Sequence, residues 1–241
     1  MNETILVPKM SLKKKMLIAL AAVVAVFAIV ITSVMTTVAL LHASDAVSNV
    51  FTIGQVGISI SETIVKPDGT PVTDRTNRGD TNTYHLIPCS TYLKDPIITV
   101  LPDSHESYLF ISVRNDIANI AADDPENGKP TIAYQLKENG WAYYQETQAG
   151  KIYVYVGEGN VPDSGSIPLD APKSAVEFAV EGEYPLFETF SVGDYDCSSY
   201  GAAQIKINAF ALQSTSFETV DAAWAEVVAN YGYLHLNPIS E

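Results

Sequence analysis

Apolar and polar positions alternate along much of the chain beyond residue 50. Val56, Ile58 and Ile60 are separated by Gly57 and Ser59, and this two-residue period is typical of a half-buried strand. Similar short apolar stretches recur between breaks rich in Asp, Pro, Gly and Ser. They predict strands over residues 84–87, 97–101, 108–113, 132–136, 141–145, 151–156, 176–180, 186–192 and 204–212.

One segment near the end of the chain has a helical period instead. Residues 219–230 predict a helix, because their apolar residues recur three and four positions apart. The apolar stripe consists of Val220, Ala223, Trp224, Val227, Val228 and Tyr231. Thr219 is placed to cap the start of this helix and Gly232 to end it. We expect Trp224 to anchor the helix in the core.

Many short strands followed by one late helix predict an all-β fold. The spacing favours an antiparallel jelly-roll-like β-sandwich with one C-terminal amphipathic helix. A parallel α/β fold would need repeated crossover helices, and the pattern shows none before residue 217.

The start of the chain has a different pattern. Residues 16–44 carry no Asp, Glu, Lys or Arg, and Lys9 and the three lysines at 13–15 precede them. Basic residues before a long apolar stretch are typical of an export signal, and this stretch is also long enough to span a bilayer. We therefore expect residues 1–46 to be a signal peptide or a retained membrane anchor. Residues 47–241 would form a single extracellular β-sandwich domain.

Two places in this segment suit cleavage by a signal peptidase. Small residues occur at Thr37 and Ala39, and again at Ser44 and Ala46. The sequence does not choose between them. Contact with a membrane is expected only through this N-terminal segment, and the rest of the chain is expected to be secreted or held at the cell surface.

Charge separates this chain from nucleic-acid-binding proteins. Among 241 residues, 14 are Lys or Arg and 28 are Asp or Glu, which gives a net charge of −14. Binding to phosphate backbones requires clustered Lys and Arg, so we expect no nucleic-acid partner. Residues 1–46 hold four of the basic residues and only two of the acidic ones, so the remainder is more acidic still.

The motifs that would carry catalysis or bind a metal are incomplete. His105 and Glu106 begin an HExxH pattern, but Leu109 stands where the second histidine would be. Gly165 and Ser166 likewise fail the GxSxG pattern of a hydrolase. The acidic residues within 123–127 do not have the spacing of an EF-hand and favour a solvated turn. We expect no catalytic residue, no metal site and no cofactor.

Only two cysteines are present, Cys89 and Cys197. Outside the cytoplasm they could form a disulfide that joins distant parts of the domain. Two free thiols are the other interpretation, since the sequence does not give their separation.

Residues 44–62, SDAVSNVFTIGQVGISISE, resemble the start of mature TasA/camelysin-type proteins. Those proteins are exported through a dedicated signal peptidase of the SipW type. The matching positions are Asp45, Asn49, Phe51, Gly54 and Val56. Further similar pieces are residues 86–88, 94–100, 108–113, 205–213, 217 and 222–225. Cys89 departs from the pattern, because glycine commonly follows that proline in the family.

The resemblance implies a jelly-roll-like fold and a structural role in extracellular fibres or biofilm matrix. Its partners would be identical subunits, with the signal peptidase acting during export. In fibre-forming members, the N-terminal segment inserts as a strand into the next subunit, which is a form of β-augmentation. The expected donor-strand residues are Val50, Phe51, Ile53, Val56, Ile58 and Ile60. The same segment could instead complete the sheet of its own domain.

Two alternative functions stay open. Camelysin is classed as a metallopeptidase, so a cell-surface metallopeptidase is one alternative, although the chain has no ligand motif for it. A membrane-anchored, monomeric surface binding domain is the other.

Overall fold

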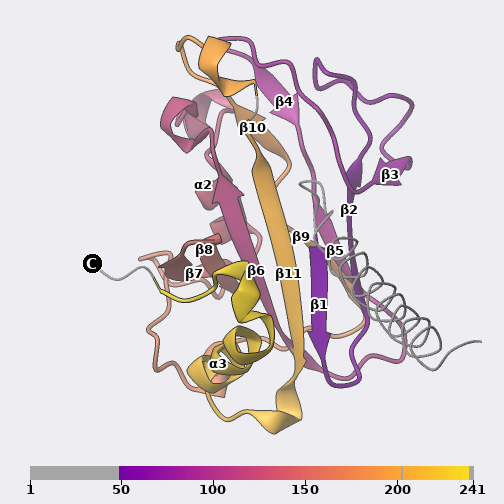
Figure 1. Cartoon of the computed structure of the whole chain (residues 1–241), viewed down its shortest axis with the longest axis vertical. Helices are drawn as coiled ribbons and strands as arrows, with labels where there is room; N and C mark the ends of the chain where they lie inside the picture. The colour runs from indigo at the N-terminus through magenta and orange to yellow at the C-terminus, as the bar shows by residue number, and fades with distance from the viewer. Residues whose placement is uncertain (1–48, 202, 239–241) are drawn as a thin grey trace, which may run out of the picture. The chain divides into compact units, whose positions relative to one another are not determined.

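A computed structural model describes residues 49–201 and 203–238, which fall in one compact unit (Figure 1). The strands are β1 (Asn49–Ile53), β2 (Ile58–Thr63), β3 (Arg78–Gly79), β4 (Thr91–Leu93), β5 (Ile97–Val100), β6 (Ser107–Asn115), β7 (Trp141–Thr147), β8 (Gly150–Tyr155), β9 (Gly182–Pro185), β10 (Thr189–Ser191) and β11 (Ile205–Gln213). The α-helices described are α2 (Ile132–Glu138) and α3 (Val220–Tyr231). Neither of these helices is long and apolar enough to cross a membrane.

The strands form three hydrogen-bonded groups. The largest sheet has the order β1-β11-β6-β8-β7, a four-stranded sheet has the order β3-β2-β5-β9, and β10 pairs with β4. The mostly-β fold predicted from the sequence is confirmed at this level. One pair departs from the antiparallel prediction, because β1 runs parallel to β11. These two strands come from opposite ends of the domain, so no short hairpin imposes an antiparallel direction on them.

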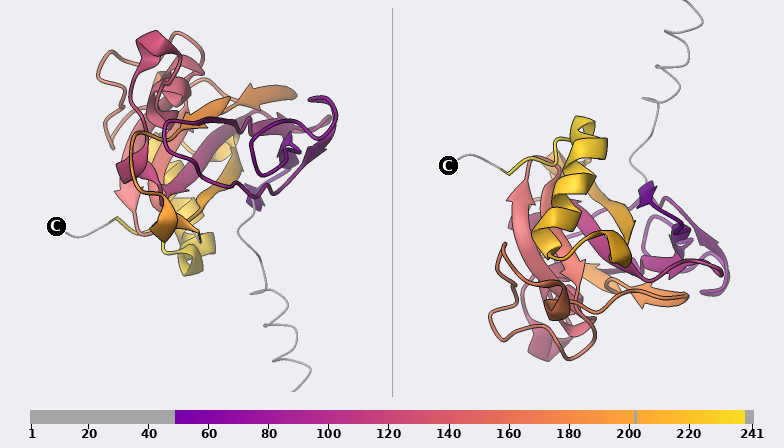
Figure 2. Two further views of the ribbon diagram at one scale, coloured as in Figure 1. Left: turned by 90° about the horizontal axis from the view of Figure 1, so that it is seen from above. Right: turned by 90° about the horizontal axis from the view of Figure 1, so that it is seen from below.

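The five-stranded sheet is covered on both faces. Along β11, Ile207, Ala209 and Ala211 belong to a core cluster shared with residues of β2 and β5. Phe210 and Leu212 alternate with them and belong to a second cluster with α3. The views from above and below show α3 lying across one face of this sheet (Figure 2). Over residues 207–212 both faces of β11 are therefore buried, and they are apolar except at Asn208.

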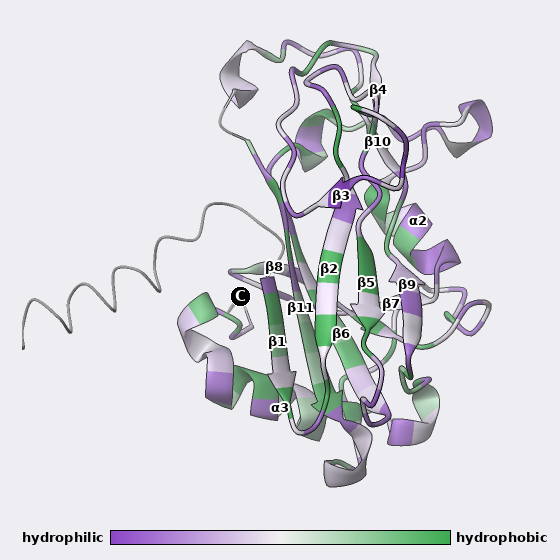
Figure 3. Cartoon of the chain, turned by 90° about the vertical axis from the view of Figure 1, so that its right-hand side faces the viewer, coloured by the Kyte–Doolittle hydropathy of each residue, from purple (hydrophilic) through white to green (hydrophobic). Residues whose placement is uncertain are grey.

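The alternation predicted for residues 56–61 is confirmed. Val56, Ile58 and Ile60 are buried, and β2 shows bands of alternating hydropathy along its length (Figure 3). In register, Ile58 lies opposite Val100 and Ile60 opposite Ile98 of β5. These apolar residues point into the core of their own domain.

The late helix is also confirmed, with one difference at its end. The Thr219 hydroxyl accepts a hydrogen bond from the Ala222 amide at 3.1 Å, and Trp224 is buried at 3% exposure. Gly232 follows the last helical residue but keeps a right-handed backbone (φ −57°) and begins a short 3₁₀ turn. His235 at the end of that turn takes the left-handed conformation instead.

Several predicted strands are wrong. Residues 132–136 lie in helix α2, whose start is capped by Thr131: its hydroxyl accepts from the Tyr134 amide at 3.1 Å. Residues 84–87 form no strand, and Tyr84 and Leu86 pack instead against a third core cluster. Residues 176–180 contribute only a bridge between Ala179 and Ser107. The apolar residues of these stretches are buried by packing. Burial alone does not require their backbone to pair with a neighbouring strand.

Strand boundaries also differ from the prediction in the region 182–192. Of the predicted strand over 186–192, only residues 189–191 form a strand, which is β10 and pairs with β4. β9 ends before the predicted range and pairs with β5. Leu186 and Phe187, between the two strands, are fully packed in the core. The chain thus passes from β9 to β10 over residues 186–188, of which the first two are buried and Glu188 is exposed.

Candidate functional site

The predicted donor segment is divided between two sheets. Val50, Phe51 and Ile53 lie in β1, on the five-stranded sheet. Ile58 and Ile60 lie in β2, an inner strand of the other sheet, and buried Val56 precedes it. The signal-cleavage residues Thr37, Ala39, Ser44 and Ala46 lie outside the described residues.

β1 is an edge strand of its sheet, and β7 lies at the opposite edge. Among the described strands, none pairs with the side of β1 that faces away from β11. The Val50 side chain is 39% exposed, whereas Phe51 and Ile53 are half-buried and contact the second core cluster. β1 therefore presents one face to the domain, and its outer backbone edge carries donors and acceptors of the kind that add a further strand.

Aromatic side chains form the seat of β1. The Phe51 ring stacks on Phe210 with centroids 5.1 Å apart and planes 18° apart, and it contacts Tyr231 at 4.8 Å. Phe210 in turn meets Trp224 of α3 edge-on at 5.8 Å. We call Phe210, Leu212, Trp224 and Tyr231 the β1 seat. One strand, β11, and one helix, α3, build this seat, and both come from the last part of the chain.

Polar contacts hold the backbone and the start of β1. The Tyr231 hydroxyl donates to the Thr52 carbonyl oxygen at 2.9 Å. Burial raises the pKa of this hydroxyl, which keeps it protonated and able to donate. The Asn49 amide donates to the Asn208 side-chain oxygen at 3.2 Å. β1 is thus fixed at its start by a side chain and further along by its backbone.

The connection from β1 to β2 bends at a glycine. Gly54 has φ +88°, and a Cβ there would lie 2.8 Å from the Cβ of Gln213. The Gln55 amide donates to the Gln213 side chain at 3.4 Å, and the Gly57 amide donates to Ser104 at 3.0 Å. This bend lets the chain leave one sheet and enter the other within residues 54–57.

Three residues of the site did not come from the sequence prediction. Asn208 and Gln213 on β11 contact β1 and its bend, and Ser112 on β6 contacts Asn208. A signal for one of them exists, because Asn208 interrupts the apolar run of β11. Nothing in the sequence pairs it with Asn49, which lies 159 residues away.

The two cysteines are free thiols in the structure. They nevertheless lie on neighbouring loops: the Cys89 amide donates to the Gly193 carbonyl at 3.0 Å, four residues before Cys197. The Cys197 Sγ is directed instead to the Tyr195 carbonyl at 3.5 Å. Cys89 is exposed and has a left-handed backbone, φ +61°.

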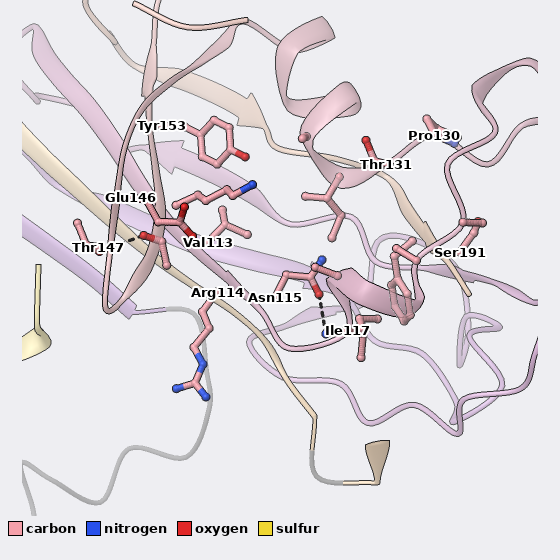
Figure 4. Close-up of a pocket in the computed structure, with 18 of the residues that line it drawn as sticks. Val113, Arg114, Asn115, Ile117, Pro130, Thr131, Glu146, Thr147, Tyr153 and Ser191 are labelled. Atoms are coloured by element: carbon pink, nitrogen blue, oxygen red, sulfur yellow. Dashed lines mark hydrogen bonds between the residues drawn. The ribbon is translucent and has the colours of Figure 1, made fainter. Parts of the chain in front are cut away.

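A separate cleft of about 500 Å³ lies between the β7–β8 hairpin, the end of β6 and the start of α2 (Figure 4). Val113, Ile117 and Ile132 contribute apolar side chains to its lining, and Thr131 and Ser191 contribute polar groups. Such a mixed lining suits a small amphipathic ligand.

Charged and titratable groups stand at the rim of the cleft. The Arg114 side chain points away from the other labelled residues and pairs with Asp116, Nε to Oδ1, at 2.8 Å. Burial raises the pKa of Tyr153 to about 12, so its hydroxyl is neutral at physiological pH. The Asn115 side chain is occupied locally, since it accepts from the Ile117 amide. Glu146 and Lys151 also line the cleft, so its lining carries charges of both signs.

Within residues 49–201 and 203–238, no group of three or more His, Cys, Asp or Glu side chains is placed to hold a metal ion. The Asp124 carboxylate binds the Asn127 backbone and side chain at 3.3 and 2.8 Å, as an acidic turn does.

A scan against protein-family models, a search of curated proteins and a search of solved structures each gave no match.

Proposed function

We propose that this chain is an exported structural subunit of extracellular fibres or biofilm matrix, of the TasA/camelysin type. The two packed sheets are taken as a jelly-roll-like sandwich, and residues 1–46 as the export segment. Subunits join when β1 of one copy occupies the β1 seat of the next.

The observation that supports this most is the placement of β1. It is the first described strand, it lies at a sheet edge, and its pairing with β11 is the one parallel pairing between the described strands. Exchange of an edge strand with an identical copy preserves every contact of the seat, so it costs little beyond opening the bend at Gly54. Head-to-tail exchange does not close on itself unless the geometry forms a ring, and it otherwise propagates into a filament.

The exchanged strand proposed here is shorter than the donor segment predicted from the sequence. β2 has partners on both sides, and its apolar residues fill the core of its own domain. Donation of β2 would therefore unfold the subunit that supplies it. We propose that Val50, Phe51 and Ile53 form the exchanged strand, while Val56, Ile58 and Ile60 stay in their own subunit.

The test uses the protein recovered from the cell surface and medium of an expressing host. Intact mass and N-terminal sequencing define the processed chain, and negative-stain microscopy shows its assembly. The decisive variant is Phe51→Ala, and the matched control is Val50→Ala, because Val50 is the neighbouring residue that points outward.

We expect filaments from the native chain and from Val50→Ala. Phe51→Ala subunits keep an intact seat but donate poorly, so a minor share of them should shorten native filaments by capping their ends. Circular dichroism establishes that this variant remains folded. Single particles from correctly processed native protein, at all concentrations tested, would refute the proposal.

The cleft favours a second candidate, a monomeric surface domain that binds a small amphipathic ligand. Tyr153 and Thr131 both border it (Figure 4). An unprocessed N-terminus, single particles and a loss of ligand binding on Ala133→Trp, which fills the cleft from α2, would support this function in place of the first.

A further inference from the structure

A row of polar side chains crosses three neighbouring strands on the face of the sheet that packs against α3. The Asn49 amide donates to the Asn208 Oδ1 at 3.2 Å, and the Asn208 amide donates to the Ser112 Oγ at 2.8 Å. Asn208 is 4% exposed and Ser112 is fully buried. The row therefore joins β1, β11 and β6 inside the protein.

The surroundings of this row are apolar. Along β11 the next residues on the same face are Phe210 and Leu212, and both are fully buried. Along β1 the corresponding residues are Phe51 and Ile53. A buried amide among such side chains is tolerated only when its donor and acceptor groups have partners. In the observed alignment, Asn208 has one partner on each side.

Other alignments of β1 would remove that partner. A shift of two residues would bring Phe51 opposite Asn208, and a phenyl ring cannot donate to the Oδ1 atom. A shift of one residue would turn Phe51 and Ile53 to the opposite face of the sheet. Apolar contacts alone distinguish a two-residue shift poorly, because both strands carry apolar residues at every second position. The polar row distinguishes the observed alignment of β1 from the alignment shifted by two residues.

We infer that Asn208, supported by Ser112, is a register lock that admits β1 in one alignment only, and that its partner is the Asn49 of this chain or of a second copy. A single buried polar pair fixes the alignment of coiled coils for the same reason. For a second copy this rests on the proposed function. For β1 of the same chain it stands without it.

Disulfide trapping tests the lock in chains that also carry Cys89→Ser and Cys197→Ser. Thr52 lies opposite Ala211 in the observed alignment, and Ala209 is the position opposite Thr52 after a two-residue shift. Two double variants, Thr52→Cys with Ala211→Cys and Thr52→Cys with Ala209→Cys, are refolded with oxidised glutathione, which takes up the electrons of the two thiols. The measured quantity is the ratio of intrachain disulfide formed in the two variants.

We expect the aligned pair to exceed the shifted pair by about tenfold or more, since one buried acceptor would otherwise lose its partner. Asn208→Leu should bring the ratio close to one. Asn230→Leu is the matched control, because Asn230 is exposed on α3 and bonds only locally with Glu226 in the described contacts, and it should leave the ratio unchanged. An unchanged ratio in Asn208→Leu would overturn the lock.

The same substitutions on separate chains test the second copy. Chains with Thr52→Cys are mixed with chains that carry Ala211→Cys or Ala209→Cys, and assembled before oxidation. Interchain disulfides that favour Ala211→Cys support the lock between copies. Interchain disulfides without that preference overturn the lock between copies but leave the strand exchange standing. A complete lack of interchain disulfides, with the intrachain preference intact, refutes the exchange while the lock within the chain holds.

Discussion

Lys94 and Glu62 form an ion pair inside the protein, with the Lys94 Nζ 2.5 Å from the Glu62 Oε2 and side-chain exposures of 8% and 2%. The other Glu62 oxygen accepts from the Asn82 amide at 3.0 Å. Next to this pair, Asp95 accepts two hydrogen bonds from Thr63, each at 2.7 Å. These contacts tie the end of β2 to the segment that enters β5.

We predict that Lys94→Met destabilises the domain by about 3–5 kcal/mol, because it leaves the Glu62 carboxylate buried without its counter-ion. Urea unfolding followed by fluorescence measures the change. Lys94→Met combined with Glu62→Leu should recover most of the loss, since a well-packed apolar pair replaces both charges.

The control for this prediction is the exposed ion pair between Arg75 and Glu188, whose side chains are 59% and 61% exposed. Arg75→Met should cost less than about 1 kcal/mol, because water already solvates both groups. Equal losses in Arg75→Met and Lys94→Met would show that burial does not set the strength of these pairs.

We predict that Cys89→Gly stabilises the folded domain by about 1 kcal/mol. Cys89 has φ +61°, a conformation that costs a residue with a Cβ about 1–2 kcal/mol and costs glycine almost nothing. Urea unfolding under reducing conditions provides the measurement. Cys197→Gly is the comparison, and it should destabilise, because Cys197 has φ −88° and gains nothing from glycine. A loss of stability in Cys89→Gly would contradict the prediction that the left-handed backbone at Cys89 is strained.

Alkaline pH should weaken the fold through buried tyrosines. Burial raises the pKa of Tyr153 from the usual 10.0 to about 12, and burial with the nearby Glu62 and Asp95 carboxylates raises the pKa of Tyr84. The unfolded chain therefore loses these protons at a lower pH than the folded chain does. The stability they contribute is complete below about pH 10 and is lost as the pH rises toward 12.

Tyr153→Phe should flatten the fall in unfolding free energy between about pH 10 and 12, with a change on the order of 2–3 kcal/mol for a two-unit shift. Tyr233→Phe is the matched control, because Tyr233 is 64% exposed, and it should follow the native curve. Identical curves for Tyr153→Phe and the native chain would rule out this tyrosine as the source.

We predict that Gly54→Ala loosens β1 without unfolding the core. The left-handed backbone and the close approach of Gln213 both disfavour a Cβ at this position. Amide hydrogen exchange should therefore accelerate at residues 50–53 while protection in β6 stays high. Gly201→Ala is the control, since a Cβ there meets nothing within 4 Å, and it should change neither region.

The alternation of residues 56–61 and the stripe of α3 were predicted correctly because burial on one side of an element follows its own period. Val56, Ile58 and Ile60 repeat every second residue, and Trp224 falls on a helical stripe. In both cases the spacing of nearby residues is enough to predict the type of element and its buried face. The helix α2 was missed because its apolar residues are few and its signals are the cap at Thr131 and the turn at Gly140. Those helix signals are weaker than the short apolar pattern of residues 132–136, which predicted a strand.

By itself, the sequence determined the β-rich class, the position of α3 and the burial of the residues in β2. Only the tertiary structure decided that the segment from 50 to 60 divides between two sheets, that β1 runs parallel to β11, and that Asn49 meets Asn208. The physical reason is that the period of apolar residues indicates which face of a strand is buried. It does not indicate which other strand lies beside that strand. Pairing between residues 159 positions apart depends on how the whole chain packs.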